Sequence, residues 1–385
     1  MQKAREILRF KDVATIVGGS TPRTDVPEYW GGEHFWVAPA ELDGSKFISS
    51  TVKTITDLAV QKTNLTLLPA GTVLLSSRAP IGKVAITTVP MYCNQGFKNV
   101  VCGDRLYNGY VYYFLKNSVS YLQSLGTGAT FKEISKKVVE NVTIPVPSME
   151  EQRRIAQELD ILTNIINCKK SLLRDLDSLA QSIFYETFGD PVSNDKGWSI
   201  ANFGDVCNSE LGKMLDTKRA SGNRKPYLCT INVLWDKIDL STQKEMLIED
   251  DELERYSVRR GDLLICEGGD IGRSAIWDKD IEMYYQNSIH RVRFDESRML
   301  PQVMLHIFKI LKERGELDNY GKGQTIKHLV KKALLSIPVP VPDIELQRVF
   351  VKRLEAINKS KKLIECSLVS AQTLFDSRMN HYFNG

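Results

Sequence analysis

The stretch from Ser148 to Phe188 opens with S-M-E-E-Q-R-R-I-A-Q-E-L and contains neither Gly nor Pro. Ser148 is placed to cap a helix, with Glu151 reaching back to it as in a capping box. Apolar residues then recur at alternating steps of four and three, which predicts one long helix with a heptad seam. The seam residues are Ile155, Leu159, Leu162, Ile166, Leu173, Leu176, Ala180 and Ile183, and Lys169 interrupts them. Such a helix needs a partner for its apolar stripe.

The chain repeats this stretch about 195 residues later. The segment I-P-V-P-S-M-E-E-Q-R at 144–153 returns as V-P-V-P-D-I-E-L-Q-R at 339–348. The second seam is Phe350, Leu354, Ile357, Lys361, Ile364, Leu368, Ala371 and Phe375. Two unrelated heptad helices could resemble each other by chance, but the shared Pro-rich entry and the shared Q-R argue against chance. One departure is Leu346, which replaces the second Glu, so we expect no capping box there.

The segments before the two helices also repeat. F-G-D-V at 203–206 answers F-K-D-V at 10–13, and Gln286 is matched with Gln95. Short β-branched or aromatic runs bounded by Gly, Pro or Asn predict strands at 34–38, 71–77, 83–88, 97–102 and 141–146, and 109–124 is more helical. We therefore predict two α+β domains on one scaffold with different surfaces: domain one at 1–147, a long helix at 148–188, domain two at 189–342 and a second long helix at 343–385.

Composition is that of an ordinary globular protein. The chain has 385 residues, 42% hydrophobic and 25% charged, with no apolar run long enough for a membrane span. Seven scattered cysteines, none in a C-x-x-C pair, favour a reducing cytoplasm over a disulfide framework. Residues 1–147 carry 16 basic and 11 acidic residues and residues 190–342 carry 23 and 24. Binding to nucleic acid must therefore depend on clustered charge rather than on bulk charge.

These motifs, in this order and duplicated, closely resemble the specificity subunits of type I restriction–modification enzymes. The residues that carry the resemblance are G-G-S-T-P at 18–22, Y-W-G-G at 29–32, the segment 71–83, Asn94-Gln95, and the I-P-V-P and E-E-Q-R-R-I motifs at 144–155, with their second copies. The resemblance implies two target-recognition domains, each reading one half of a split DNA target. It also implies that the two helices form an antiparallel coiled coil with approximate two-fold symmetry, which sets the gap between the half-sites. The expected partners are duplex DNA and two methyltransferase subunits. The methyltransferase subunits are in turn expected to bind restriction subunits.

No catalytic constellation is visible in the sequence. The Asn/Asp-Pro-Pro-aromatic loop and the Gly-rich cofactor loop of a DNA adenine methyltransferase are both missing, so we expect no enzyme activity and no cofactor. The segment E-G-G-D-I-G-R-S at 267–274 falls short of a phosphate-binding loop and is interpreted as a tight turn before a strand. The five histidines share no metal-ligand spacing, so no metal is expected.

Basic residues in loops are the candidates for DNA contact. The clearest cluster lies at 213–225, where positive charge is mixed with Ser, Thr and Asn, the side chains that contact phosphates and base edges. For each residue taken singly, a solvated surface role is the alternative. The candidates are Lys213, Lys218, Arg219, Arg224 and Lys225 in this cluster, Arg23, Arg78, Lys83 and Lys98 in domain one, and the matched positions Arg273, Thr130, Lys132, Thr325 and Lys327.

Partner subunits are expected on the outer faces of the helices, near their starts, at Arg153, Arg154, Gln347 and Arg348. The seam leucines are interpreted only as the core of the helix pair. A structural adaptor, in which the coiled coil presents two protein-binding modules, is the alternative function, because the strongest motifs belong to the scaffold and only the loops argue for DNA.

Overall fold

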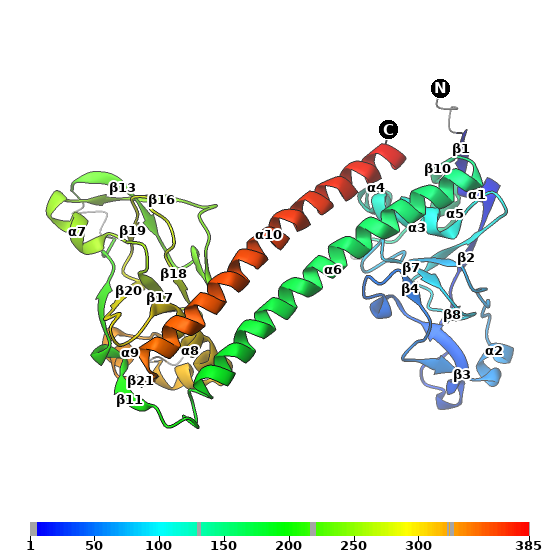
Figure 1. The fold of residues 1–385 in the computed structure, drawn as a ribbon. Coiled ribbons are helices and arrows are strands. Elements are labelled where there is room, and N and C mark those ends of the chain that lie inside the picture. Colours follow the sequence, from blue (N-terminus) through cyan, green and yellow to red (C-terminus); the bar gives the residue numbers. More distant parts are fainter. Residues whose placement is uncertain (1–5, 129–131, 216–220, 322, 324–326, 385) are drawn as a thin grey trace. The chain divides into compact units, whose positions relative to one another are not determined.

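The computed structural model describes residues 6–128, 132–215, 221–321, 323 and 327–384, and its elements are labelled in Figure 1. The chain divides into two compact units. Unit 1 comprises residues 1–170 and 366–385, and unit 2 comprises residues 171–365. Each unit therefore contains one globular domain, part of one long helix and part of the other.

The domain of unit 1 is built on two sheets and a ribbon. A five-stranded sheet has the order β2 (Ala14–Gly18), β9 (Lys98–Cys102), β6 (Val73–Leu75), β7 (Val84–Thr87) and β4 (Phe47–Ile48). A three-stranded sheet has the order β5 (Thr54–Ile55), β3 (Trp30–Val37) and β8 (Tyr92–Cys93), and β1 (Glu6–Arg9) pairs with β10 (Thr143–Val146). The helices are α1 (Phe10–Val13), α2 (Asp57–Lys62), α3 (Asn108–Asn117), α4 (Val119–Ser124) and α5 (Lys136–Asn141), with 3-10 turns η1 (Pro27–Tyr29) and η2 (Pro39–Glu41).

The domain of unit 2 repeats this plan. Its four-stranded sheet β12 (Cys207–Leu211), β20 (Ile289–Phe294), β17 (Leu263–Cys266) and β18 (Ser274–Ile276) follows the order of β2, β9, β6 and β7. Its three-stranded sheet is β16 (Lys244–Ile248), β13 (Asn223–Leu228) and β19 (Tyr284–Tyr285), its ribbon is β11 (Ser199–Asn202) with β21 (Pro338–Val341), and β14 (Val233–Leu234) pairs with β15 (Lys237–Ile238). The helices are α7 (Leu253–Tyr256), α8 (Pro301–Glu313) and α9 (Lys331–Leu335), with 3-10 turns η3 (Phe203–Asp205), η4 (Asp250–Glu252) and η5 (Glu316–Tyr320).

The predicted strands are all present, with ends shifted by a few residues, and the predicted turn at 267–273 lies between β17 and β18. One predicted match is wrong by one residue. Gln286 donates its backbone N–H to Leu228 as Asn94 does to Val37, so Gln286 corresponds to Asn94 and not to Gln95. The first domain has Asn-Gln at this point of the repeat and the second domain has Gln-Asn, so the sequence alone permits either alignment.

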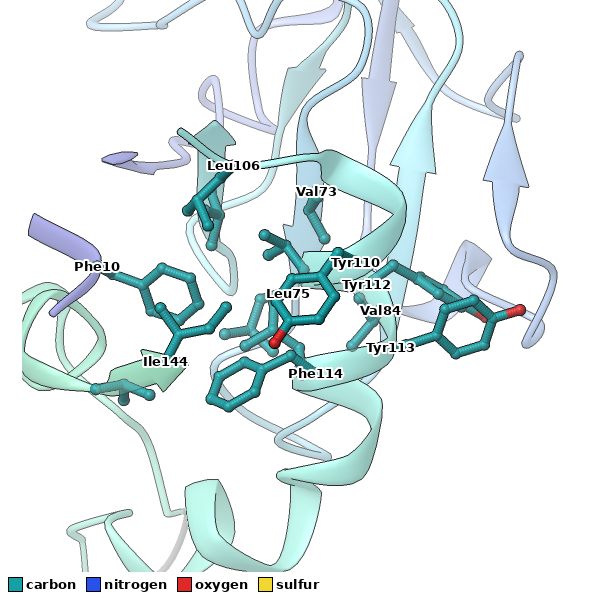
Figure 2. Close-up of a cluster of buried hydrophobic side chains, with 14 of the residues drawn as sticks. Phe10, Val73, Leu75, Val84, Leu106, Tyr110, Tyr112, Tyr113, Phe114 and Ile144 are labelled. Carbon is teal, nitrogen blue, oxygen red and sulfur yellow. The ribbon is translucent and has the colours of Figure 1, made fainter. Parts of the chain in front are cut away.

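The core of unit 1 forms where α3 covers the five-stranded sheet. Figure 2 shows Tyr110 and Phe114 of α3 among side chains of β6, β7 and β10 and beside Phe10. Phe10 and Phe114 meet edge to face at 5.9 Å between ring centroids. Residues 109–115 of α3 are all buried, because one side of this helix faces the sheet and the other faces the long helices.

The two long helices are α6 (Met149–Phe188) and α10 (Ile344–Phe383), within a residue or two of the predicted spans. In unit 1, Glu158 of α6 pairs with Arg378 at 2.9 Å and accepts a hydrogen bond from Tyr382 at 2.6 Å. Residues Met379 and Tyr382 are buried in the core of that unit. The last turns of α10 therefore complete the core that the first turns of α6 begin.

Unit 2 contains the reciprocal arrangement. Phe184 and Phe188, at the end of α6, lie edge to face with Phe350 near the start of α10, at 5.6 and 5.3 Å. Lys361, the predicted break in the second seam, pairs with Asp177 at 2.6 Å. In unit 1 the first turns of α6 meet the last turns of α10, and in unit 2 the last turns of α6 meet the first turns of α10, so the helices run antiparallel. All predicted seam positions are buried or half-buried.

Two buried glutamines tie each long helix to its own domain. Gln152 accepts a hydrogen bond from Tyr107 N at 2.8 Å and donates to Arg105 O and Pro147 O at 2.8 and 3.0 Å. Gln347 makes the same set with Leu300 N, Arg298 O and Pro342 O, at 2.8, 2.9 and 2.9 Å. Both side chains are fully buried. The expectation that Gln347 offers an outer face for partners is therefore wrong, because its amide satisfies backbone groups inside unit 2.

The helix starts are capped by different residues. Ser148 Oγ accepts a hydrogen bond from Glu151 N at 3.2 Å, as the sequence predicted. At the second helix, where Leu346 replaces Glu, Asp343 Oδ1 accepts from Glu345 N at 2.8 Å and from Leu346 N at 3.4 Å. The second helix therefore keeps an N-cap even though its sequence lacks the Glu of the capping box.

Substituting Gln347→Ala is expected to lower the free energy of unfolding of unit 2 by about 3 kcal/mol. The change leaves one buried N–H and two buried carbonyls without their partner, and each unsatisfied group costs about 1–3 kcal/mol. Urea unfolding followed by tryptophan fluorescence measures this loss. Lys359→Ala is the matched control, because Lys359 is exposed on the same helix within unit 2. Equal unfolding midpoints for the two variants would show that the buried amide does not secure the helix.

Candidate nucleic-acid interface

The predicted basic cluster at 213–225 is paired with carboxylates wherever it is described. Lys213 donates to Glu252, and Lys225 donates to Glu282 at 2.7 Å. Arg224 lies on β13, 78% exposed, with its guanidinium 3.8 Å from Glu245 on the neighbouring β16. Lys218 and Arg219 lie outside the described residues. Arg224 and Lys225 thus lie on the middle strand of the three-stranded sheet and Lys213 lies just after β12, and each of the three cations has an acidic neighbour.

These pairs change the titration of the acids. The hydrogen bond from Lys213 lowers the pKa of Glu252, and the bond from Lys225 lowers the pKa of Glu282. Both carboxylates therefore stay ionised near neutral pH and keep neutralising the lysines. Lys213 and Lys225 are also only 17% and 23% exposed, so each must leave its carboxylate before it can reach a phosphate.

The matched cations after Ile-Gly have a structural role in both domains. Lys83 donates to Pro39 O and Leu42 O at 3.1 and 2.9 Å, and Arg273 donates to Thr230 O at 2.7 Å. Each cation thereby ties a loop of the three-stranded sheet to the turn before β7 or β18. Their match in sequence reflects a shared way of joining the two sheets within a domain.

The other candidate DNA contacts of the first domain differ in their exposure and in the carboxylates that they pair with. Arg23 is 73% exposed and forms a two-bond pair with Asp25. Arg78 and Lys98 converge on Glu133, at 4.0 and 3.2 Å. Lys132 is exposed one residue before Glu133, at the edge of the described loop, whereas Thr130 lies outside the described residues.

The corresponding loop of the second domain differs in its contacts. Lys327 donates to Asp318 O at 3.1 Å, and the residue after it is His328, which occupies the place of Glu133. Thr325 lies outside the described residues. No cation pair corresponding to Arg78 and Lys98 is found in the described part of this domain, because Gly268 and His290 stand at those positions.

A polar tip next to Arg78, formed by Thr21, Asn94 and Gln95, was not among the predicted DNA contacts. Asn94 donates to Thr21 Oγ1 at 3.0 Å, and Thr21 donates to Gln95 Oε1. Asn94 also accepts from Gly96 N at 2.7 Å, which shapes the turn. Asn-Gln-Gly between two short strands was a signal, since amide side chains in a turn hydrogen-bond the backbone and also read base edges.

Of the predicted docking residues, the three arginines lie at the helix starts, whereas Gln347 is buried. The guanidinium of Arg153 lies 4.8 Å above the ring of Tyr107, and Arg154 pairs with Glu151 at 2.7 Å. Arg348 pairs with Glu345 at 2.8 Å. All three arginines are exposed at the surface of the first helical turns.

The outer face of α6 carries exposed apolar residues that sequence reasoning also missed. Ile161 and Ile165 are 61% and 39% exposed in the part of the helix that belongs to unit 1. Leu172 and Leu179, in the part that belongs to unit 2, are each 46% exposed. Their steps of four, seven and seven form a second heptad spacing beside the buried seam, and that spacing is readable in the sequence.

The described residues contain no group of three or more His, Cys, Asp or Glu side chains that could hold a metal ion. Four of the histidines have defined side-chain contacts: His34 contacts Asp57 at 2.7 Å, His290 is buried against Leu329 O, His306 stacks on Phe184, and the His381 ring meets the Tyr382 ring. Burial lowers the pKa of both His290 and His306. Within the part of the chain that was searched, no helix is long and apolar enough to cross a membrane.

Comparison with known proteins gives this geometry a family. The family model of the type I restriction modification DNA specificity domain matches residues 3–176 and again residues 195–368, so the chain belongs to this family and carries two copies of the domain. The expected fold class, two α+β domains with two long helices, is confirmed with it. The family is described as a DNA specificity domain, and the similar proteins are named as specificity subunits of type I restriction enzymes.

Comparisons with individual proteins give the same family. The chain is 36% identical over 226 residues to the MjaIX type I restriction enzyme specificity subunit of Methanocaldococcus jannaschii, a match that spans 54% of this chain and about half (52%) of that protein. It is 24% identical over 376 residues to the MjaVIII specificity subunit of the same organism, covering 92% and 86%. A crystal structure of the specificity subunit from M. genitalium aligns with a TM-score of 0.60 at 16% identity, covering 100% of this chain and 97% of that one, which shows a common fold.

Replacing Glu252 and Glu282 with Gln is expected to strengthen non-specific binding to duplex DNA. Released Lys213 and Lys225 can then contact phosphates, which steepens the slope of log affinity against log salt by up to about two units. Fluorescence anisotropy of a labelled duplex at several salt concentrations gives the slope. The control is Glu254→Gln with Asp280→Asn, which removes the same charge next to Arg259 and Arg260. Equal slopes in the two variants would show that the 213–225 cluster lies away from DNA.

Proposed function

We propose that this chain is the DNA-reading subunit of a type I restriction–modification complex and that each globular domain reads one half of a bipartite duplex target. The candidate contacts in the first domain are Arg23, Arg78 and Lys132 with the polar tip of Thr21, Asn94 and Gln95. In the second domain the candidates are Lys213, Arg224 and Lys225. The structural roles of Lys83 and Arg273 make these two residues supports of the loops rather than direct contacts.

The observation that carries this proposal is a repeated frame with different side chains. The two domains share the order of four sheet strands and the register of the equivalent pairs β2–β9 and β12–β20, yet the residues at their tips differ in charge and size. Base edges are read by individual side chains, whereas the backbone frame positions them. Two unlike surfaces on one frame suit two unlike half-sites.

The adaptor alternative explains the helices but not the tips. Protein-binding modules are expected to bury an apolar core patch with few charged residues. The tips instead present arginine, lysine and amide side chains, which are the groups that contact phosphates and bases. Enrichment of a split motif from random duplexes, with the methyltransferase partner present, separates the two functions.

Exchanging residues 190–342 for the equivalent segment of another such subunit is expected to change one half of the methylated motif and leave the other half unchanged. Both long helices keep their native sequence in this exchange. The cores that they complete therefore change only in the residues that the exchanged segment contributes. Single-molecule sequencing of DNA from cells that carry the hybrid and its methyltransferase reads the motif. A change in both halves would contradict independent reading by the two domains.

We further propose that methyltransferase subunits dock along the long helices and bring the restriction subunits with them. The apolar face of Ile161 and Ile165 suits an amphipathic partner helix, which inserts apolar residues at the same spacing. Arg153 and Arg154 lie at the start of the same helix and can pair with acidic residues of the partner. Because Arg348 repeats the position of Arg153 on α10, the basic helix start recurs, and we propose a second methyltransferase subunit there.

Ile161→Glu with Ile165→Glu is expected to reduce co-purification of the methyltransferase with the chain by tenfold or more. The two carboxylates would have to be buried in the new helix contact without partners, which costs several kcal/mol. The control is Asn164→Glu with Asn167→Glu, which adds the same charge at exposed positions on another side of α6. Undiminished co-purification of the first variant would exclude this face.

A further inference from the structure

Arg78 occupies a defined place at the tip of the first domain. It follows Ser77 in the turn after β6, and its backbone forms an antiparallel bridge with Glu133. A Cβ atom placed on Gly96 would lie 3.3 Å from Arg78 Nε, so the guanidinium lies directly over Gly96. Arg78 therefore stands between the Asn94–Gly96 turn and the loop that ends at Glu133.

Glu133 holds this arginine from one side. Its Oε2 lies 4.0 Å from Arg78 Nη1, and its Oε1 accepts from Lys98 Nζ at 3.2 Å. Lys98 Nζ also lies 3.3 Å from Ser77 Oγ and from Gln95 O, and its side chain is only 14% exposed. Lys98 is therefore a fixed support for the carboxylate and is too enclosed to contact DNA itself. The Arg78 side chain, 38% exposed, is the cation of this group that can reach outward.

The second domain has the same backbone and a different set of side chains. Ile134 N donates to Ser77 O at 3.0 Å, and Leu329 N donates to Glu267 O at 2.7 Å. The Arg78–Glu133 bridge recurs as a Gly268–His328 bridge. Gly268 has no side chain, so the second domain lacks an arginine at this point of its frame.

We propose that Arg78, positioned by Glu133, reads a guanine in the half-site of the first domain and that the second domain makes no such contact from the equivalent position, Gly268. This inference rests on the proposed function. Arginine donating two hydrogen bonds to the O6 and N7 of guanine is the commonest specific contact in the major groove. The adjacent carboxylate of Glu133, 40% exposed, would repel a phosphate but not the neutral edge of a base. The neighbouring Gln95 and Thr21 carry amide and hydroxyl groups of the kind that hydrogen-bond base edges.

The test is the methylated motif in cells that carry the full chain with its methyltransferase. Arg78→Ala is expected to make one guanine position of one half-site degenerate, by about ten- to hundredfold in discrimination, and to leave the other half-site intact. Arg78→Lys keeps the charge but loses the two-bond geometry, so it should lose the same discrimination with an unchanged salt slope. Lys62→Ala, an exposed change on α2, is the control and should leave the motif unchanged.

Glu133 is tested as a positioning residue. Glu133→Gln is expected to relax the same guanine position as Arg78→Ala, and Glu133→Asp should restore part of the discrimination. A merely structural role would lower methylation at all sites without relaxing one position. The transplant Gly268→Arg with His328→Glu, which also removes the imidazole 3.1 Å from the Gly268 Cβ position, is expected to add a guanine requirement to the other half-site.

The outcomes separate this inference from the proposed function. An unchanged motif in Arg78→Ala, or uniform loss of methylation with no relaxed position, overturns guanine reading while the split motif of the unaltered chain still supports the proposed function. A wild-type chain that directs methylation to no split motif would instead overturn the proposed function. Relaxation of positions in both half-sites would overturn the inference that Arg78 reads only one half-site.

Discussion

The buried amides of Gln152 and Gln347 are the constraint on which both units depend. Each glutamine joins the first turn of a long helix to two segments of its own domain, one before α3 or α8 and one at the helix entry. A buried amide that lost any of these bonds would leave backbone groups unsatisfied. The bonds therefore fix where each helix leaves its domain. In the E-x-Q-R motif, the Gln therefore bonds backbone groups inside the domain, whereas the Arg lies at the surface.

The long helices also make each unit a composite. The core of unit 1 contains Met379 and Tyr382 from the far end of the chain, and the core of unit 2 contains Phe184 and Phe188 from the end of α6. A domain cut at residue 147 would expose the apolar surface that these residues cover. Exchange of recognition surfaces is therefore easiest when both helices are kept and only the segment between them is replaced.

The sequence predicted the parts of this structure that follow from periodicity. The heptad seam, the duplicated helix starts and most strands depend on local spacing, and the structure has them. The pairings of Lys213 with Glu252 and Lys225 with Glu282 join residues 39 and 57 positions apart, so no local pattern indicates them. Gln347 was misplaced for a related reason. Its helical position permits exposure, and only the approach of the α8 entry at Leu300 buries it.

The same distinction explains how one frame supports two surfaces. The hydrogen bonds that hold the loop to the sheet at Ile134 and Leu329 use backbone N–H and C=O groups, so they form with any side chain at Ser77 or Glu267. Side chains at the next position, Arg78 and Gly268, are then free to differ without loss of the fold. Where the frame does use side chains, both copies keep the same bonds: Gln152 and Gln347 are the same residue, whereas Lys83 and Arg273 differ but both donate to carbonyls of a neighbouring loop. Residues that differ between structurally equivalent positions at the tips are therefore the ones available for reading DNA, and residues that match in bonding as well as in place maintain the scaffold.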